Sequence, residues 1–396
     1  MIGSMTRKTT KDTDVTTAGR HPERQFGAVN PPVVRASTIV FPTVADMDKA
    51  KAKPFDSVYY GRHGTPTTFA FEEAVADLEG GYRSIACSSG LAAINVALSA
   101  FVAAGDHILV TDAAYDPIRR NCEIWLKRMG VETTFYDPRI GARIKDLIRP
   151  NTRIVFVESP GSLTFEVQDV PAIADAARAA GAVVVMDNTW ATPLYFQPFA
   201  HGVDVSVQAA TKYIVGHSDA MLGVVTTTEK SFLPVRRQAA ILGACASPDD
   251  CALGSRGIRT LAVRLARHQD TALRLADWLK GRSEVARVIH PALPGSSDHV
   301  LWKRDFLGST GLFSIILKPC SKTALAAFLD HLELFAMGFS WGGYESLILP
   351  ADPTPHRTAV PWAAEGPLVR IHAGLEDPAD LMADLDAGFA RLRSAA

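Results

Sequence analysis

Residues 203–223 have the sequence VDVSVQAATKYIVGHSDAMLG. The segment begins with a valine-rich run that predicts a buried strand, and it continues into small residues on either side of Lys212. A lysine at the end of a strand is usually a solvated surface charge. The surroundings of Lys212 are small and uncharged, which permits the lowered pKa that a Schiff-base lysine requires. Lys212 is therefore a candidate functional residue.

Three more apolar runs of this kind precede it along the chain. They are HILVTD (107–112), TRIVFVES (152–159) and AVVVMDNT (182–189). Helix-like stretches such as DVPAIADAARAAG (169–181) lie between several of them. Because short buried strands alternate with helices, the region between about residues 84 and 227 is predicted to form an α/β fold with a mostly parallel, doubly wound sheet.

In such sheets, ligands bind at the carboxyl ends of the strands. The polar residues at these positions are Asp112, Glu158 and Asp187, together with the segment around Lys212. An aspartate at a strand end can also cap a turn or a helix, so Asp187 alone does not establish a site. We expect a functional site to be built from this group of residues.

The chain changes character after about residue 250. A long helical pattern covers 259–281, isolated strands are predicted at 285–291, 311–318, 345–350 and 368–374, and a last helix at 377–396. The first 62 residues have turn signals without a strong period, which predicts an extended arm. The predicted organisation is therefore an arm over 1–62, an α/β domain over 63–250 and a smaller C-terminal α+β domain over 251–396.

The composition excludes several classes of protein. The 396 residues are 47% hydrophobic and 21% charged, which is typical of a globular protein. Because 41 basic residues nearly balance 42 acidic ones, no net field attracts nucleic acid or an anionic membrane, and a small-molecule substrate is expected. We also find neither an apolar stretch of membrane-spanning length nor the apolar core of a signal peptide, which predicts a cytoplasmic protein.

The cysteines and histidines do not predict a metal site. The five cysteines, which lack CxxC spacing and indicate buried thiols in a reducing compartment, are Cys87, Cys122, Cys245, Cys251 and Cys320. The histidines without any shared ligand spacing, which we interpret as structural or surface residues, are His63, His201, His217 and His372. We expect no metal.

A second candidate feature lies in CSSGLAAINVALSAFVAAG (87–105), where Ser89 and Gly90 begin a helical run. A helix N-terminus offers free N–H groups to a phosphate, and glycine permits close approach, although Ser-Gly is also an ordinary N-cap. A buried Asp187 would need a cationic partner, and a protonated pyridine nitrogen is one. A phosphate cradle, a carboxylate and a desolvated lysine together fit one cofactor, pyridoxal 5′-phosphate (PLP).

Ten segments beyond residue 20 resemble the Cys/Met-metabolism family of fold-type I PLP-dependent enzymes. They are YYGRHGTPT (59–67), SSGLAA (88–93), AYDP (114–117), ESPGSLTFEV (158–167), DNTWATPLYF (187–196), AATKYIVGHSDAM (209–221), SRGIRTLAVRL (255–265), HPALPGS (290–296), SWGGYESL (340–347) and RIHAGLEDPADLMADLDAGFARL (370–392). The resemblance implies the fold-type I architecture, PLP as cofactor, and a homodimer with shared active sites that pairs into a tetramer.

The resemblance also implies a role for individual residues. Lys212 would bind PLP covalently and act as the catalytic base, while Asp187 would pair with the ring nitrogen. Tyr115 would stack on the ring, and either Tyr115 or Lys212 would protonate the departing sulfur. The residues that would bind the phosphate are Ser89, Gly90, Leu91 and Thr211 and, from the neighbouring subunit, Tyr60 and Arg62.

Three residues would form the substrate site by the same resemblance. Arg370 would bind the substrate α-carboxylate with a bidentate fork, although an unplaced arginine is otherwise most simply a structural ion pair. Ser340 and Trp341 would lie beside it. Trp341 after Ser340 resembles the family members that eliminate at the β carbon, whereas γ-acting relatives tend to have a smaller aliphatic residue there.

The predicted activity is therefore a PLP-dependent carbon–sulfur lyase reaction. It is an α,β-elimination that converts cystathionine to homocysteine, pyruvate and ammonia, a step toward methionine. The alternatives are a γ-acting relative (cystathionine γ-synthase, cystathionine γ-lyase or methionine γ-lyase) and, more remotely, a non-catalytic binding protein of the same fold. A nicotinamide oxidoreductase is disfavoured because no GxGxxG follows an early strand. Phe339 departs from a tyrosine in a close β-eliminating relative, which affects the expected substrate range.

Overall fold

A computed structural model describes residues 9–395, and the larger of the two sheets in this range has seven strands. The strands are β1 (Arg83–Cys87), β2 (His107–Thr111), β3 (Glu132–Tyr136), β4 (Thr152–Glu158), β5 (Val183–Asp187), β6 (Val205–Gln208) and β7 (Gly223–Thr227). Their order in the sheet is β1-β7-β6-β5-β4-β2-β3. The pairings from β3 to β6 are parallel, and β7 is antiparallel to both of its neighbours. The predicted mostly parallel sheet is confirmed.

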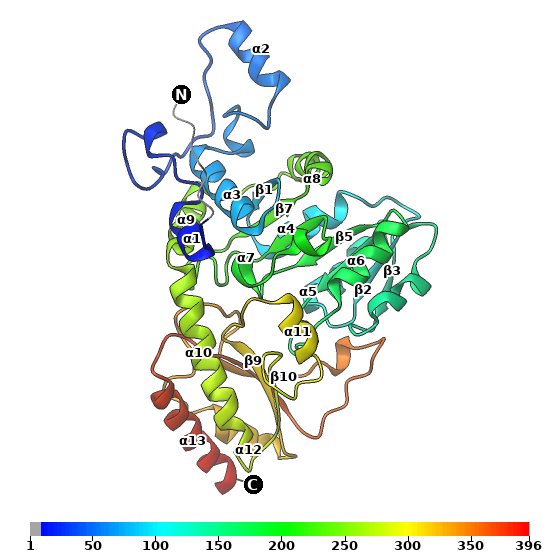
Figure 1. Ribbon diagram of the computed structural model, residues 1–396, viewed down its shortest axis with the longest axis vertical. Coiled ribbons are helices and arrows are strands. Elements are labelled where there is room, and N and C mark those ends of the chain that lie inside the picture. Colours follow the sequence, from blue (N-terminus) through cyan, green and yellow to red (C-terminus); the bar gives the residue numbers. More distant parts are fainter. Residues whose placement is uncertain (1–8, 396) are drawn as a thin grey trace.

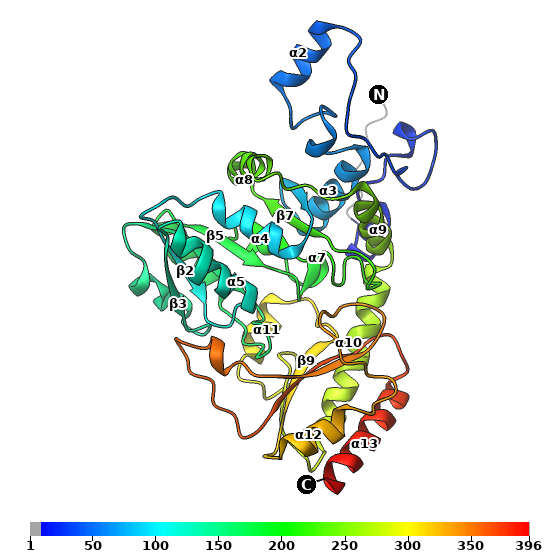
Figure 2. The ribbon, with the colours of Figure 1, turned by 180° about the vertical axis from the view of Figure 1, so that it is seen from behind.

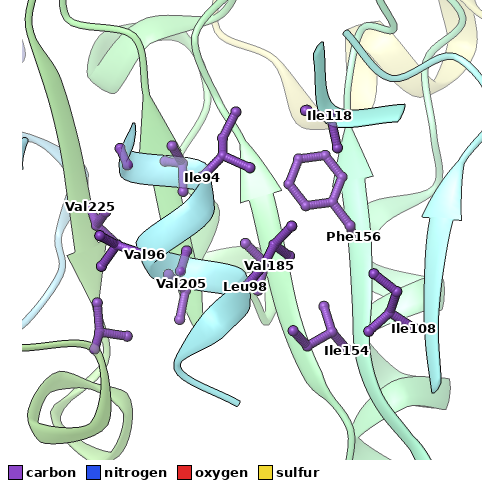
Figure 3. Close-up of a cluster of buried hydrophobic side chains, with 14 of the residues drawn as sticks. Ile94, Val96, Leu98, Ile108, Ile118, Ile154, Phe156, Val185, Val205 and Val225 are labelled. Carbon is purple, nitrogen blue, oxygen red and sulfur yellow. The ribbon is translucent and has the colours of Figure 1, made fainter. Parts of the chain in front are cut away.

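The central strands are buried on both faces because successive side chains alternate between two cores. On β4, Ile154 and Phe156 belong to one core and Val155 and Val157 to the other. The first core lies under helix α4 (Gly90–Ser99), whose Ile94, Val96 and Leu98 face the strands (Figure 3). Helices on both faces make the sheet doubly wound, as predicted.

The remaining helices around this sheet follow the chain order. They are α3 (Pro66–Glu79), α5 (Asp116–Arg120), a π-helical turn (Asn121–Leu126), a 3₁₀ helix (Gly141–Leu147), α6 (Val170–Ala179), α7 (Thr192–Tyr195), a 3₁₀ helix (Pro198–His201), α8 (Glu229–Ile241) and α9 (Pro248–Arg259). The four predicted strands correspond to β2, β4, β5 and β6.

The C-terminal part contains an antiparallel sheet of four strands in the order β10-β11-β9-β8. Its elements are α10 (Leu261–Lys280), β8 (Val285–Ile289), α11 (His299–Asp305), β9 (Leu312–Leu317), α12 (Lys322–Leu329), β10 (Leu347–Ala351), a 3₁₀ helix (Thr354–His356), β11 (Leu368–His372) and α13 (Pro378–Ser394). Helices α10, α12 and α13 pack against one face of this sheet and share its core. The predicted α+β character is present, while the boundaries at residues 62 and 250 stay predictions.

The predicted arm contains short helices that the weak period of the first 62 residues did not indicate, and its first eight residues lie outside the described range. The arm contains α1 (Lys11–Thr17), α2 (Val44–Ala52) and 3₁₀ helices at Pro22–Arg24 and Gly61–His63. Helix α1 forms because Val15 is buried in the core that α3 and α9 share. Helix α2 is capped by Thr43, whose side chain accepts the Asp46 N–H, and it projects away from the sheets (Figures 1 and 2).

Two further expectations concern single residues and the membrane. Cys87, Cys122 and Cys251 are buried thiols as predicted, but Cys245 is exposed at the surface, and Cys320, which packs against the C-terminal core from a loop, is partly exposed. No helix within residues 9–395 combines the length and apolar character that crossing a membrane requires.

Asp112, at the end of β2, ties the C-terminal part to the large sheet. Its buried carboxylate accepts hydrogen bonds from the guanidinium groups of Arg119 (2.6 Å) and Arg357 (3.4 Å). It also accepts the backbone N–H groups of residues 358–360. A buried carboxylate with so many donors is structural, and it explains why Asp112, unlike the other strand-end residues, does not line the cavity described below.

We predict that Asp112→Ala strongly lowers the free energy of unfolding, because it leaves Arg119 and Arg357 buried with fewer partners. Removing one partner of a buried ion pair typically costs about 3–5 kcal/mol. Urea denaturation followed by circular dichroism measures the loss. Asp175→Ala is the control, since the Asp175–Arg178 pair is exposed and should contribute less than about 1 kcal/mol. Equal losses in the two variants would contradict the structural role of Asp112.

Candidate active site

A cavity of about 420 Å³ lies where the carboxyl ends of β4, β5 and β6 meet the N-terminus of α4 and residues of the C-terminal part. The predicted site residues that line it are Ser89, Gly90, Leu91, Tyr115, Asp187, Thr211, Lys212, Ser340, Trp341 and Arg370. Glu158, which the strand-end rule indicated without assigning it a role, lines it as well. The structure therefore brings together almost all the residues selected from the sequence.

Close backbone packing positions the start of α4 beside the end of β6. Ser89 is the N-cap, and its hydroxyl accepts the Ala92 N–H at 3.1 Å. A Cβ at Gly90 would lie 2.5 Å from Ala209 Cβ, so glycine is required for this approach. The geometry of a helix start leaves the amides of Gly90 and Leu91 without intrahelical acceptors. This end of the cavity can therefore bind an anionic group such as a phosphate.

Lys212 is the central cation of the cavity. Its Nζ donates a hydrogen bond to Ser340 Oγ at 2.6 Å and lies 5.3 Å from the centroid of the Trp341 ring. Burial is the main cause that lowers the Lys212 pKa to about 8, and the nearby Arg370 charge lowers it further, while Asp187 opposes the shift. The amine is thus much closer to its neutral, nucleophilic form than an exposed lysine.

Two carboxyl groups lie side by side at the strand ends. Glu158 and Asp187 are register partners on the parallel strands β4 and β5. Burial raises the pKa of both groups, and the Asp187 charge raises the pKa of Glu158 further. The Asp187 pKa rises less because its Oδ1 accepts the Thr189 N–H at 2.9 Å and Lys212 is nearby. Asp187 is therefore the better candidate for an ionised carboxylate that meets a cation.

Arg370 and Ser340 form the C-terminal wall of the cavity. One N–H of Arg370 donates to Ser340 O at 2.9 Å. Burial lowers the Arg370 pKa to about 10, which still leaves the guanidinium charged at neutral pH. Ser340 has a positive φ of 82°, a conformation that non-glycine residues rarely adopt. Ser340 therefore contacts both basic residues, because its hydroxyl accepts from Lys212 and its backbone oxygen accepts from Arg370.

Tyr115 and Thr211 reach the cavity in different ways. Tyr115 is the N-cap residue of α5, and its N–H donates to Glu158 Oε2 at 2.7 Å. Burial raises the Tyr115 pKa, so its hydroxyl keeps its proton at neutral pH. The Thr211 hydroxyl donates to Leu222 O at 3.1 Å and accepts the Leu222 N–H at 2.9 Å. Thr211 would have to release Leu222 O before its hydroxyl could donate to a phosphate.

Tyr60 and Arg62 are the predicted residues that do not line this cavity. Arg62 donates to Ala240 O at 2.8 Å near the end of α8, and Tyr60 is exposed. Their expected role in a neighbouring subunit stays a prediction.

His217 is also outside the cavity, and its Nδ1 lies 2.7 Å from Val215 O. In the described part of the chain, no three side chains of His, Cys, Asp or Glu gather in a way that could hold a metal ion.

The sequence did not indicate the apolar wall of the cavity. Leu163 and Phe165, from the segment after β4, line it with positive φ angles of 64° and 55°. Met221 and Phe339 add further apolar surface. The family-like segments ESPGSLTFEV and AATKYIVGHSDAM contain the first three of these residues, but nothing in their local pattern shows which side chains face a ligand.

Comparisons with known proteins agree with this geometry. The family model described as "Cys/Met metabolism PLP-dependent enzyme" matches residues 12–390. Cystathionine beta-lyase MetC of Escherichia coli (strain K12) is 46% identical over 96% of this chain and 98% of its own length. L-alanine/L-glutamate racemase of Wolbachia pipientis wMel is 41% identical over 95% of this chain and 96% of its own length.

A solved structure is similar over the whole chain as well. Cystathionine gamma synthase from Xanthomonas oryzae pv. oryzae, in complex with aminoacrylate and cysteine, has a TM-score of 0.89 and 30% identity, and the match covers 98% of this chain and 100% of that one. The chain belongs to the Cys/Met metabolism family of PLP-dependent enzymes, with the fold-type I architecture and PLP as cofactor.

The residues of this cavity fit PLP chemically. The free amides at Gly90 and Leu91 suit its phosphate, the buried Asp187 suits its ring nitrogen, and the desolvated amine of Lys212 suits its aldehyde. Each group lies at the edge of the sheet where ligands bind in doubly wound folds.

We predict that covalent capture of PLP by the apoprotein accelerates with pH through a midpoint near the Lys212 pKa of about 8, because only the neutral amine is nucleophilic. Absorbance of the bound cofactor after rapid mixing measures the rate. Arg370→Met should raise the midpoint, since Arg370 lowers the Lys212 pKa, and Asp187→Asn should lower it. A wild-type midpoint close to 10.5, the value of an ordinary lysine, would show that Lys212 is not desolvated.

Proposed function

We propose that this protein is a PLP-dependent carbon–sulfur lyase that carries out α,β-elimination of cystathionine. The overall change is cystathionine plus water to homocysteine, pyruvate and ammonia. The observation that carries the proposal is the cavity in which the desolvated Lys212 amine, the Ser340 turn and the Arg370 guanidinium meet. The 46% identity to an enzyme named cystathionine beta-lyase supports the choice of substrate.

The chain supplies the groups that hold the cofactor. Gly90 and Leu91 would bind the phosphate through their amides, with Ser89 as the cap that fixes the start of the helix. Asp187 would pair with the ring nitrogen and keep it protonated, and Tyr115 would stack on the ring. When bound through Lys212, PLP supplies an electron sink that makes the Cα proton of an amino acid acidic.

The remaining groups handle the substrate. Arg370 binds the α-carboxylate through the N–H groups that Ser340 O does not use. Lys212 Nζ would act as the base that removes the Cα proton. Ser340 Oγ holds this amine by its 2.6 Å hydrogen bond and so limits its orientation. Lys212 or Tyr115 then gives a proton to the departing sulfur, which leaves as the thiol of homocysteine.

The β-eliminating reaction is favoured over the γ-acting alternatives by two observations. The curated relative that is 46% identical is named a β-lyase, whereas the γ synthase of known structure is 30% identical. In addition, Trp341 borders the Lys212 amine, and its indole fills the space next to Ser340 that a smaller aliphatic side chain would leave open.

Racemisation is a second candidate activity. The relative from Wolbachia pipientis wMel, which is named a racemase, is 41% identical over nearly the whole chain. A base that removes the Cα proton can also return it, so the same Lys212 chemistry allows inversion when the substrate has no leaving group at Cβ. The Cβ substituent therefore determines which of the two reactions follows.

We also propose that the protein acts in the cytoplasm as a homo-oligomer with shared sites. The five free cysteines favour a reducing compartment. The arm leaves the side chains of Phe26, Val40 and Val44 highly exposed, which is apolar surface that a second copy would cover. A dimer in which Tyr60 and Arg62 reach the partner's phosphate site would use this arm, and two such dimers would form a tetramer.

The proposed activity predicts pyruvate, and no α-ketobutyrate, as the oxo acid formed from cystathionine. γ-Elimination would give α-ketobutyrate, so chromatography of the oxo acids separates the two reactions. The same preparation should be incubated with L-alanine and the D-isomer measured. Formation of D-alanine without any pyruvate from cystathionine would replace the lyase proposal by the racemase alternative.

The shared-site proposal predicts that two inactive variants restore activity when they exchange subunits. In a hybrid dimer of Lys212→Ala with Arg62→Ala, one site carries both lesions and the other carries none. Half of an equal mixture is hybrid and half of the hybrid's sites are intact, so about a quarter of wild-type activity should return. Each variant refolded alone is the control. If mixing gives only the average of the two variants, Arg62 serves its own subunit and the shared site is wrong.

A further inference from the structure

Strand β11 presents two residues to the cavity side of the C-terminal sheet. Val369 and Ile371 point into the core under α10, α12 and α13, so Arg370 and His372 lie on the opposite face. His372 is completely buried, although its sequence context suggested only a structural or surface histidine. Arg370 and His372 are therefore neighbours on the one strand face that meets the Ser340 turn.

Both residues hold the same turn by hydrogen bonds. Arg370 Nη2 donates to Ser340 O at 2.9 Å, and the Gly342 N–H donates to His372 Nε2 at 3.1 Å. Nε2 also lies 3.2 Å from Gly343 O. A neutral imidazole has one N–H, so Nε2 accepts the Gly342 N–H when the ring proton is on Nδ1 and donates to Gly343 O when the proton is on Nε2. In the form protonated at Nδ1, neutral His372 is the acceptor for the Gly342 N–H.

The surroundings of His372 favour the neutral form. Burial lowers the His372 pKa well below its ordinary value, and the nearby His268, Arg370 and Lys212 lower it further, while the contact with Gly343 O opposes the shift. The rings of His268 on α10 and Tyr213 after β6 lie 5.2 Å and 5.8 Å from the His372 ring. These groups offer no anion that would stabilise a charged imidazole.

The turn from Ser340 to Gly342 has an unfavourable backbone conformation that contacts with other segments must stabilise. Ser340 and Gly342 both have positive φ angles, 82° and 90°. A Cβ at Gly342 would lie about 3.0 Å from Lys212 Cα, so the turn packs directly on the backbone of Lys212. A non-glycine residue at positive φ costs free energy and persists only where its neighbours fix it. The two hydrogen bonds from β11 provide that constraint.

We propose that His372 is a positioning residue for the reaction: by accepting the Gly342 N–H it fixes the Ser340–Gly342 turn, and so sets where Ser340 Oγ meets Lys212 Nζ. The proposal rests on the proposed function, because it concerns the placement of the same amine. His372 does not line the cavity, so it acts through the turn and not on the substrate.

The first test measures hydrogen exchange of the Gly342 amide in the wild-type holoenzyme. The hydrogen bond to His372 predicts that this amide exchanges at least about tenfold more slowly than the neighbouring Gly343 amide, although both belong to the same loop. His372→Phe should abolish the difference. Equal exchange of the two amides in the wild-type protein would overturn the proposal, and this measurement requires no variant to fold.

The second test compares kinetic constants of variants, each normalised to PLP-loaded sites. His372→Phe removes the acceptor and should lower kcat for cystathionine by about tenfold, the factor that corresponds to the free energy of one buried hydrogen bond. KM should rise less, because Arg370 remains. His372→Gln, which places an amide oxygen near the position of Nε2, should recover most of the loss.

His290→Phe is the matched control for the loss of a buried histidine. His290 is also buried, and its Nδ1 accepts the Ala292 N–H at 3.1 Å, but it lies outside the cavity and does not contact the turn. This variant should lose thermal stability and keep wild-type kcat per loaded site. If His290→Phe and His372→Phe lower kcat equally, or if His372→Gln has no higher kcat than His372→Phe, His372 has only a structural role.

Wild-type protein that releases no pyruvate would instead refute the proposed function, while the exchange measurement would still test His372.

Discussion

The hydrogen bond from Lys212 Nζ to Ser340 Oγ is the contact on which the proposed site depends. It joins the segment after β6 to a turn 128 residues later in the chain, and it lies in a cavity where burial brings the Lys212 pKa to about 8. The same turn receives Arg370 and His372 from β11. In the proposed site, the large sheet would therefore supply the cofactor groups, the C-terminal sheet would supply the substrate groups, and one turn would set the distance between them.

Much of this arrangement could be predicted from local sequence pattern. The valine-rich runs at β2, β4, β5 and β6 indicated a parallel sheet, and the carboxyl-end rule selected Glu158, Asp187 and Lys212, which do line one cavity. Strand β3 was harder to find because it is an edge strand with a half-exposed pattern. Capping preference similarly identified Ser89 as the residue that begins α4.

Other features could not be predicted because they arise from contacts between distant segments. Asp112 and Asp187 both follow a valine-rich or apolar run at the end of a strand, yet Asp112 forms buried ion pairs with Arg119 and Arg357. His372 has no partner at metal spacing, and its role depends on a glycine amide 30 residues away. Helix α1 is too short to be stable alone and forms against α3 and α9. In each case tertiary packing determines what the local pattern leaves open.

Reduction of the PLP-loaded protein with borohydride, followed by peptide mapping, tests the central claim most directly. The reagent fixes the cofactor to the lysine that binds it. Since Lys212 is the one lysine among residues 9–395 that lines the cavity, a single modified peptide containing Lys212 is the expected result. Modification of a different lysine, or of several exposed lysines to a similar extent, would contradict the assignment of the site and the mechanism built on it.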